Sequence, residues 1–220
     1  MLDWTPPATL TATRLEGTHV VLEPLAVDHA EALQVAIGDS GTSWRFLPVE
    51  APGDVATMRA LVEEQLADPG LETFVVRPGG GAVAGRVSWM RQDPAHGCAE
   101  VGWVVFGPTL QRTAAATETV SLLLRQAFDA GYRRVEWKCD DLNEPSKRAA
   151  VRLGFTAEGV FRQHRVVKGL NRDTAWFAML DREWPVVRAA HEAWLAPSTF
   201  DEHGHQRHPL TVQSAFPAVG

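Results

Sequence analysis

The chain has 220 residues, of which 45% are apolar and 22% charged, and its formal net charge is −6. This length allows one well-filled core, and the acidic balance argues against a general nucleic-acid-binding protein, which needs a basic surface for phosphates. No apolar run approaches the roughly 20 residues of a membrane span, and residues 1–7 lack a signal-peptide pattern, so we expect no membrane partner and a cytoplasmic location.

The first part of the chain predicts one strand and two helices. Residues 20–25 form an apolar run typical of a strand, and Asp28 and Asp54 stand where helix N-caps are expected. A loop over residues 38–52 separates the two helices. The buried positions expected on these helices are Ala30, Leu33, Ile37, Met58, Leu61, Val62 and Leu66.

Three strands follow in succession, over residues 73–77, 83–90 and 99–106. Turn signals separate them, Pro78–Gly81 first and Pro94–Gly97 second. Short turns of this kind join antiparallel neighbours. We therefore expect an antiparallel meander in the centre of the chain.

The second half alternates helices and strands. Apolar residues at helical spacing predict a long helix over residues 113–130, ended by Gly131. A strand over 134–139, a short helix over 143–154, two strands over 160–167 and 173–180, and a last helix from residue 181 complete the order. The last helix is expected to bury Trp184, Val187, His191, Trp194 and Leu195. This order predicts a mixed α/β sheet with helices on both faces.

A single domain is expected over residues 16–196. Residues 1–15 form an N-terminal extension, and residues 197–220 form a tail rich in His, Pro, Gln and Ser that we expect to be extended or poorly ordered. Histidines in flexible tails of this kind usually bind metal only incidentally, so we assign no metal site to this tail. Cys98 and Cys139 are interpreted as buried thiols.

The segment from Trp103 to Glu118 carries the chemistry. A buried strand leads into a turn that opens the long helix, and small residues occupy the first helical turn. Free amides at a helix N-terminus bind phosphate, and Arg112 is placed to add a charge. On its own, this pattern is more typical of an ordinary alanine-rich helix start.

Two later motifs strengthen the phosphate interpretation. Asn143 precedes Ser146 by three residues, and Leu153-Gly154-Phe155 follows; alone, each is explained by a helix cap or a helix end. Together with Gln111-Arg112-Thr113, Thr117-Glu118, Glu158-Gly159 and the final Leu180–Pro185 run, they resemble the GCN5-related N-acetyltransferases (GNAT), particularly the ribosomal-protein-alanine-acetyltransferase-like branch. The resemblance covers residues 16–186. It implies a GNAT fold, an α/β arrangement with a mixed, mostly antiparallel seven-stranded sheet, helices on both faces and splayed central strands.

The resemblance implies an acetyl-CoA-dependent enzyme. Acetyl-CoA would be the co-substrate, and the acetyl group would pass by direct attack in a ternary complex to a primary amine, either a protein N-terminus or a small molecule. Two alternatives stay open: a CoA-binding module without turnover, and an enzyme that uses another acyl-CoA. The chain has Ala114 where the family usually has glycine and Ala116 where this branch often has asparagine, which motivates the first alternative.

The implied cofactor contacts lie on the strand before the long helix, on that helix and on the short helix. They are Trp103, Val104, Val105, Gln111, Arg112, Thr113, Ala114, Ala115, Ala116, Thr117, Asn143 and Ser146. By the same resemblance, the Val104 amide polarises the thioester and Ser146 protonates the leaving thiolate.

The acceptor amine must lose a proton, and two residues are candidates for the general base. Glu100 is the first choice and His164 the second, and a water chain without a dedicated base remains open. The acceptor pocket is expected to use Trp44, Arg45, Phe46 and Trp89, together with the hairpin around residues 168–172. The Trp-rich final elements favour a homodimer.

Overall fold

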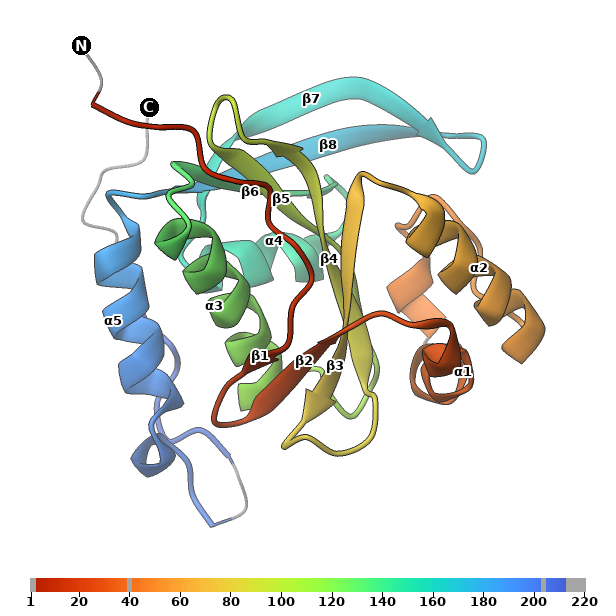
Figure 1. Ribbon diagram of the computed structural model, residues 1–220, viewed down its shortest axis with the longest axis horizontal. Helices are drawn as coiled ribbons and strands as arrows, with labels where there is room; N and C mark the ends of the chain where they lie inside the picture. The colour runs from red at the N-terminus through yellow and green to blue at the C-terminus, as the bar shows by residue number, and fades with distance from the viewer. Residues whose placement is uncertain (1–2, 39–40, 203–204, 213–220) are drawn as a thin grey trace.

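The computed structural model describes residues 3–38, 41–202 and 205–212, which form one eight-stranded sheet with helices on both faces (Figure 1). The strand order is β1-β2-β3-β4-β5-β6-β8-β7. The strands are β1 (Leu15–Glu16), β2 (Val20–Pro24), β3 (Leu71–Pro78), β4 (Gly85–Asp93), β5 (Cys98–Phe106), β6 (Arg134–Asp140), β7 (Thr156–Val167) and β8 (Leu170–Leu180). The α-helices are α1 (Ala30–Ile37), α2 (Val55–Ala67), α3 (Ala114–Asp129), α4 (Glu144–Arg152) and α5 (Trp184–Leu195).

The seven expected strands are all present, and the mixed α/β fold is confirmed. Every pairing in the sheet is antiparallel except that of β5 with β6. The eighth strand is the two-residue β1, whose Leu15 lies opposite Leu22. It is too short to leave a periodic sequence signal.

Three of the helices begin at side-chain caps. Asp54 accepts from the Thr57 amide at 2.8 Å, and Thr113 and Asn143 cap α3 and α4. The expectation for Asp28 was wrong, because the chain enters α1 through a 3-10 turn (Val27–His29), and the helix has no side-chain cap.

Helix α2 is turned slightly from its expected orientation. Leu66 is 47% exposed, whereas the neighbouring Gln65 is only 4% exposed and faces the sheet. An amide in place of leucine on the buried face needs a polar partner beneath it. That partner is Arg86 of β4.

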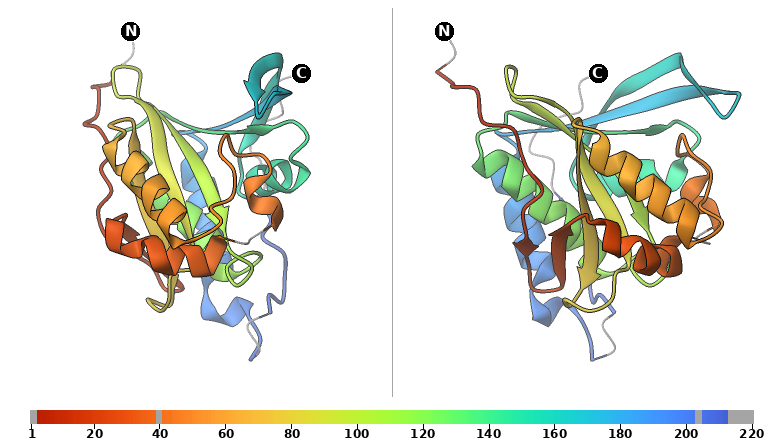
Figure 2. Two further views of the ribbon diagram at one scale, coloured as in Figure 1. Left: turned by 90° about the vertical axis from the view of Figure 1, so that its right-hand side faces the viewer. Right: turned by 45° about the vertical axis from the view of Figure 1, so that its right-hand side comes forward.

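The sheet separates two apolar cores. The larger core lies between the sheet and helices α3, α4 and α5, and the smaller lies under α1 and α2. The β7–β8 hairpin extends beyond the sheet on the side of α1 and α2 (Figure 2). Its tip contacts the loop after α1, where the Lys168 ammonium donates to the Trp44 carbonyl at 3.1 Å.

The described residues near each terminus, 3–14 and 205–212, lie against this framework. Residues 3–14, which we name the N-terminal strap, run across β4 and α3, with Leu10 buried and its amide bonded to Gln92 at 2.7 Å. The tail is more ordered than expected: Leu210 is buried beside α5, and the Trp194 indole donates to the His208 carbonyl. His203 and residues 213–220 lie outside the described residues.

Helix α5 buries the five residues expected of it. Among them, His191 is 0% exposed, and its Nε2 lies 3.1 Å from the Leu153 carbonyl at the end of α4. Its Nδ1 has no partner among the described residues. Burial lowers the pKa of His191 from 6.5 to about 4, because the charged imidazolium would lose its hydration.

The fold is therefore expected to weaken in mild acid. The unfolded chain protonates His191 near pH 6.5 and the folded chain only near pH 4, so stability is lost as the pH falls through this window. The expected loss is roughly 3 kcal/mol, measured as the difference between the unfolding free energies obtained from urea denaturation at pH 7 and at pH 4. The unfolding free energy of His191→Gln should change less between pH 7 and pH 4 than that of wild type. His96→Gln, a change at an exposed position, should keep the wild-type pH dependence. An unchanged slope in His191→Gln would contradict this assignment.

Candidate active site

A gap opens between β5 and β6 near the middle of the sheet. The two parallel strands pair only from Cys98 with Arg134 to Val101 with Trp137, although both continue beyond these positions. At this point β5 also bulges against β4, and Trp103 takes a φ of +49°. A bulge releases backbone groups from the ladder. The adjacent Val104 amide is therefore placed where the gap begins.

The N-terminus of α3 provides free amide groups at the end of β5. Helix geometry leaves the amides of Ala114 and Ala115 without intrahelical partners, and no described residue accepts from the amides of Arg112 and Thr113. Arg112 has a φ of +62°, is exposed, and has no ion-pair partner in the described parts of the chain. These groups suit a pyrophosphate, because unpartnered amides, the positive end of the α3 dipole and the Arg112 guanidinium lie together at one helix start.

Three other residues of this segment are occupied by structural contacts. Gln111 donates to the Phe106 carbonyl at 2.8 Å, and the Ala116 amide donates to the Thr113 hydroxyl. The Thr117 hydroxyl accepts from Arg152 at 3.0 Å, and its amide donates to the Thr113 carbonyl. The unpartnered amides at this helix start are thus fewer than the sequence indicated, and are those of residues 112–115.

Asn143 and Ser146 lie across the gap from β5. The Asn143 side chain accepts from the Ser146 amide at 3.2 Å and caps α4. The Ser146 hydroxyl accepts from the Trp137 indole at 2.9 Å and lies beside Cys139. The Ser146 hydroxyl also hydrogen-bonds with the Cys139 sulfur.

The opposite side of the sheet carries the expected acceptor elements. The loop after α1 and the β7–β8 hairpin meet there, since Lys168 also pairs with Glu50 at 3.3 Å. Trp44 is 2% exposed and donates to the Ile37 carbonyl, so it anchors the loop. Arg45 is exposed and lies over the Phe46 ring at 5.2 Å.

Trp89 points away from these elements. It is fully buried in the larger core, and its indole donates to Gln126 of α3 at 2.8 Å. Side chains alternate between faces along a strand, and Trp89 falls on the face opposite to Arg86 and Ser88. It is therefore not brought to the acceptor side.

Glu100 is enclosed by cations. The carboxylate is 3% exposed, both of its oxygens accept from Arg91 at 2.8 Å, and Lys138 lies 2.9 Å from Oε2. Lys138 also pairs with Glu136 at 2.6 Å and lies 3.9 Å from the centroid of the Trp176 ring. The carboxylate thus organises two positive charges beside the gap.

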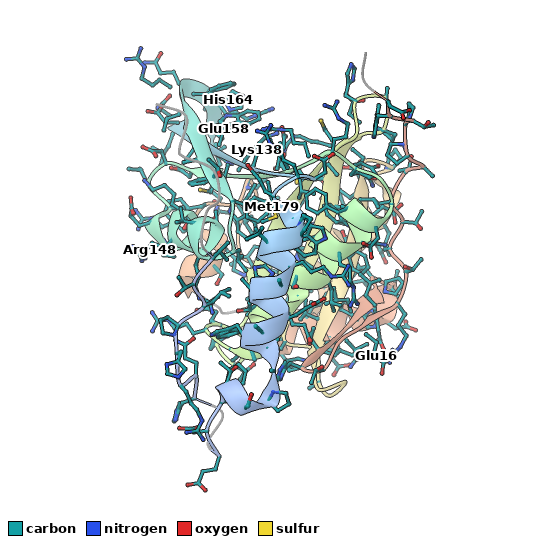
Figure 3. The ribbon with its side chains drawn as sticks, turned by 90° about the vertical axis from the view of Figure 1, so that its left-hand side faces the viewer. Glu16, Lys138, Arg148, Glu158, His164 and Met179 are labelled. Atoms are coloured by element: carbon teal, nitrogen blue, oxygen red, sulfur yellow. The ribbon has the colours of Figure 1, made fainter. Side chains whose placement is uncertain are left out.

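His164 lies in the same region, on β7. Figure 3 shows His164 and Lys138 at the same end of the molecule. A bulge in β7 lets the imidazole reach Thr174, whose hydroxyl is 3.0 Å from Nδ1, while Nε2 has no partner among the described residues. Burial, and then the charges of nearby arginines and Lys138, lower the pKa of His164.

Four residues of this site were missed by the sequence reasoning: Arg86, Arg91, Lys138 and Trp176. The sequence does contain a pattern that could have indicated Lys138. Charged Arg134, Glu136 and Lys138 alternate with apolar residues along one strand, so the three share one face. The bulged position of Arg91, with a φ of +47°, leaves no such pattern.

The described residues also form a groove of about 320 Å³ between β1, α3 and α5. None of its lining residues belongs to the β5–β6 gap or to the hairpin, so it is not assigned to the chemistry. Within residues 3–38, 41–202 and 205–212, no three His, Cys, Asp or Glu side chains gather as metal ligands. No helix in the same ranges is long and apolar enough to cross a membrane.

Comparison with known proteins decides the family. The model of the acetyltransferase (GNAT) domain family matches residues 19–156. The chain belongs to the GNAT acetyltransferase family. A crystal structure of a GCN5-related N-acetyltransferase from Brucella melitensis superimposes with a TM-score of 0.91, at 42% identity over 94% of this chain and 96% of that one.

Two further relatives have lower sequence identity to this chain. A probable acetyltransferase from Chromobacterium violaceum is 37% identical, with a TM-score of 0.80, over 84% of this chain and 94% of that one. The putative ribosomal N-acetyltransferase YdaF of Bacillus subtilis (strain 168) is 26% identical over 170 residues, 74% of this chain and 91% of that protein. The splayed strands and the helix N-terminus are thus those of a GNAT enzyme.

Proposed function

We propose that this enzyme transfers an acetyl group from acetyl-CoA to a primary amine by direct attack in a ternary complex. The observation that carries the proposal is the β5–β6 gap, which joins the free amides of α3 to the acceptor side of the sheet. A protein with the same fold, the microcin C7 self immunity acetyltransferase MccE, has been crystallised with acetyl-CoA and AMP.

The cofactor's place follows from the free donors. The amides of residues 112–115 and the Arg112 guanidinium would hold the pyrophosphate, and β5 from Trp103 to Val105 would pair with the pantetheine arm. Bound acetyl-CoA supplies the activated acetyl group. The Val104 amide donates to its carbonyl oxygen, and Ser146 delivers a proton to the departing sulfur.

The base in this proposal is His164 rather than Glu100. Both Glu100 oxygens already accept from cations, whereas the lowered pKa of His164 keeps its imidazole neutral at pH 7. With its Nδ1 proton donated to Thr174, the His164 Nε2 has a free lone pair for the amine's proton.

A proline at position 114 tests the cofactor site. Ala114 is the first residue of α3, where proline is tolerated because its amide has no intrahelical partner, and the extended Thr113 before it (φ −102°, ψ 166°) suits proline. Ala114→Pro removes one phosphate donor and should weaken acetyl-CoA binding about tenfold by calorimetry. Arg112→Glu should weaken it further.

The matched control is Val55→Pro, the same change at the first residue of α2. It should leave acetyl-CoA affinity unchanged, and melting curves of both variants report any loss of fold. Wild-type protein that fails to bind acetyl-CoA, or an Ala114→Pro variant that binds as tightly as wild type, would refute the proposed cofactor site. Wild-type binding without acetylation of any amine would instead favour the CoA-binding module.

A homodimer, if it forms, uses a different surface from the one expected. Trp184 and Trp194 are buried, so the final helix offers no Trp-rich face. The exposed apolar side chains lie on the β7–β8 hairpin: Val160, Phe161, Val166 and Leu170. We propose this hairpin as the self-association surface, and native mass measurement showing only monomer at micromolar concentration would refute it.

A further inference from the structure

Arg86 of β4 is a buried cation without an anion. It is 0% exposed, and no Asp or Glu within the described parts of the chain pairs with it. Its guanidinium lies between the rings of Trp44 and Trp103, at 5.4 and 5.0 Å from their centroids. Burial of an unpaired charge is costly, and attraction to the aromatic rings offsets only part of that cost.

Three donors in this cluster have no acceptor. Nη1 of Arg86 donates to the Gln65 carbonyl oxygen, but Nε and Nη2 of Arg86 and Nε2 of Gln65 are buried without partners. Nε and Nη2 lie along one edge of the planar guanidinium. This edge matches the two oxygens of a carboxylate. Burial lowers the pKa of Arg86 to about 9, which leaves it charged at neutral pH.

The cluster lies beside the proposed reaction centre. Arg86 pairs with Val105 across the β5 bulge, and Trp103 of that bulge stacks on it next to the Val104 amide. Trp44 is buried, whereas Trp103 is only half-buried. Of the two rings that lie over the guanidinium, that of Trp103 is therefore the one nearer to solvent.

We propose that Arg86 and Gln65 bind a carboxylate of the acceptor, which makes the acceptor a small amino acid rather than a protein N-terminus. The proposal rests on the proposed acetyltransferase function and specifies its substrate class. A carboxylate bound along the Nε–Nη2 edge would satisfy both orphan donors of Arg86. It would also place the acceptor's amine within a few bonds of this anchor, on the side of the bulge where the Val104 amide lies.

The test compares each amino acid with its own carboxamide. Release of the CoA thiol is measured with α-amino acids and with straight-chain ω-amino acids of increasing length, each against the corresponding amide. We expect wild type to favour the best acid over its amide in kcat/KM by about tenfold or more. Arg86→Met should reduce that ratio about tenfold, whereas Arg77→Met, a matched change at an ion-paired arginine of β3, should not.

A binding measurement keeps the test independent of turnover. The N-acetylated form of each amino acid, with CoA present, should raise the melting temperature of wild type but not of Arg86→Met. The variant itself should melt at or above the wild-type temperature, because it removes an unpaired buried charge. Equal acid-to-amide ratios in both proteins, or equal shifts by the N-acetyl amino acids, would overturn the proposal. Failure of the acetyltransferase function is recognised separately, by the acetyl-CoA titration of the Ala114→Pro series.

Discussion

Replacement of His164 by glutamine is expected to lower kcat about 100-fold or more. The amine acceptor is protonated near pH 7, and the loss of a positioned base typically costs a factor of this size. Because the pKa of His164 is lowered, the wild-type kcat/KM should be flat near neutral pH and fall on the acid side, below pH 6.5. The His164→Gln profile should lack this acid limb. The measurement is the initial rate against pH with saturating acetyl-CoA.

Glu100→Gln is the decisive comparison. If the carboxylate only holds Arg91 and Lys138 in place, its amide should reduce kcat less than His164→Gln and should keep the acid limb. His96→Gln serves as the control, since His96 is exposed on the β4–β5 turn. Loss of the acid limb in Glu100→Gln with retention in His164→Gln would assign the base to Glu100.

The largest expected effect on stability comes from Trp89→Ala. The indole is fully buried between the sheet and α3 and donates to Gln126, so its removal leaves a large cavity and an unpaired amide oxygen. The cost should be roughly 4 kcal/mol, which lowers the melting temperature by about 10 °C. Trp89→Phe keeps the ring and loses the hydrogen bond, and should cost about 1–2 kcal/mol.

The KM of the same variants for the amine distinguishes a role of Trp89 in core packing from a role in binding the acceptor. If Trp89 belongs to the core, the KM for the amine should be unchanged in Trp89→Phe at a temperature where the variant is folded. A raised KM with a normal melting temperature would instead place the indole in the acceptor pocket, as the sequence suggested.

Most of the fold could be predicted because its elements are locally encoded. The apolar spacing of α3, the capping residues Asp54, Thr113 and Asn143, and the turn between β4 and β5 each act over a few residues. The free amides at the N-terminus of α3, which we propose bind the pyrophosphate, were predictable for the same reason. They depend on one helix start and one preceding strand.

The acceptor side could not be predicted from local patterns. Strand alternation places Trp89 and Arg86 on opposite faces of β4, but it does not say which face lies toward the acceptor side. The sheet order decides that, and the bulge at Trp103 sets which groups meet there. The cations around Glu100 come from β4 and β6, so only the sheet order brings them together. Register shifts of this kind depend on tertiary pairing and leave little trace in hydrophobic alternation.

The N-terminal strap imposes an order on biosynthesis. Apart from Arg14, which pairs locally with Glu23, its hydrogen-bond partners are Glu72, Gln92, Gln126 and Gly131, which lie 60 to 127 residues further along the chain. The strap leaves the ribosome before these partners, but its binding surface is incomplete until α3 and the residue that ends it have been synthesised. The strap is therefore synthesised before its partners but is among the last segments to reach its native contacts. A nascent chain halted before residue 131 would expose this face of the sheet to chaperones.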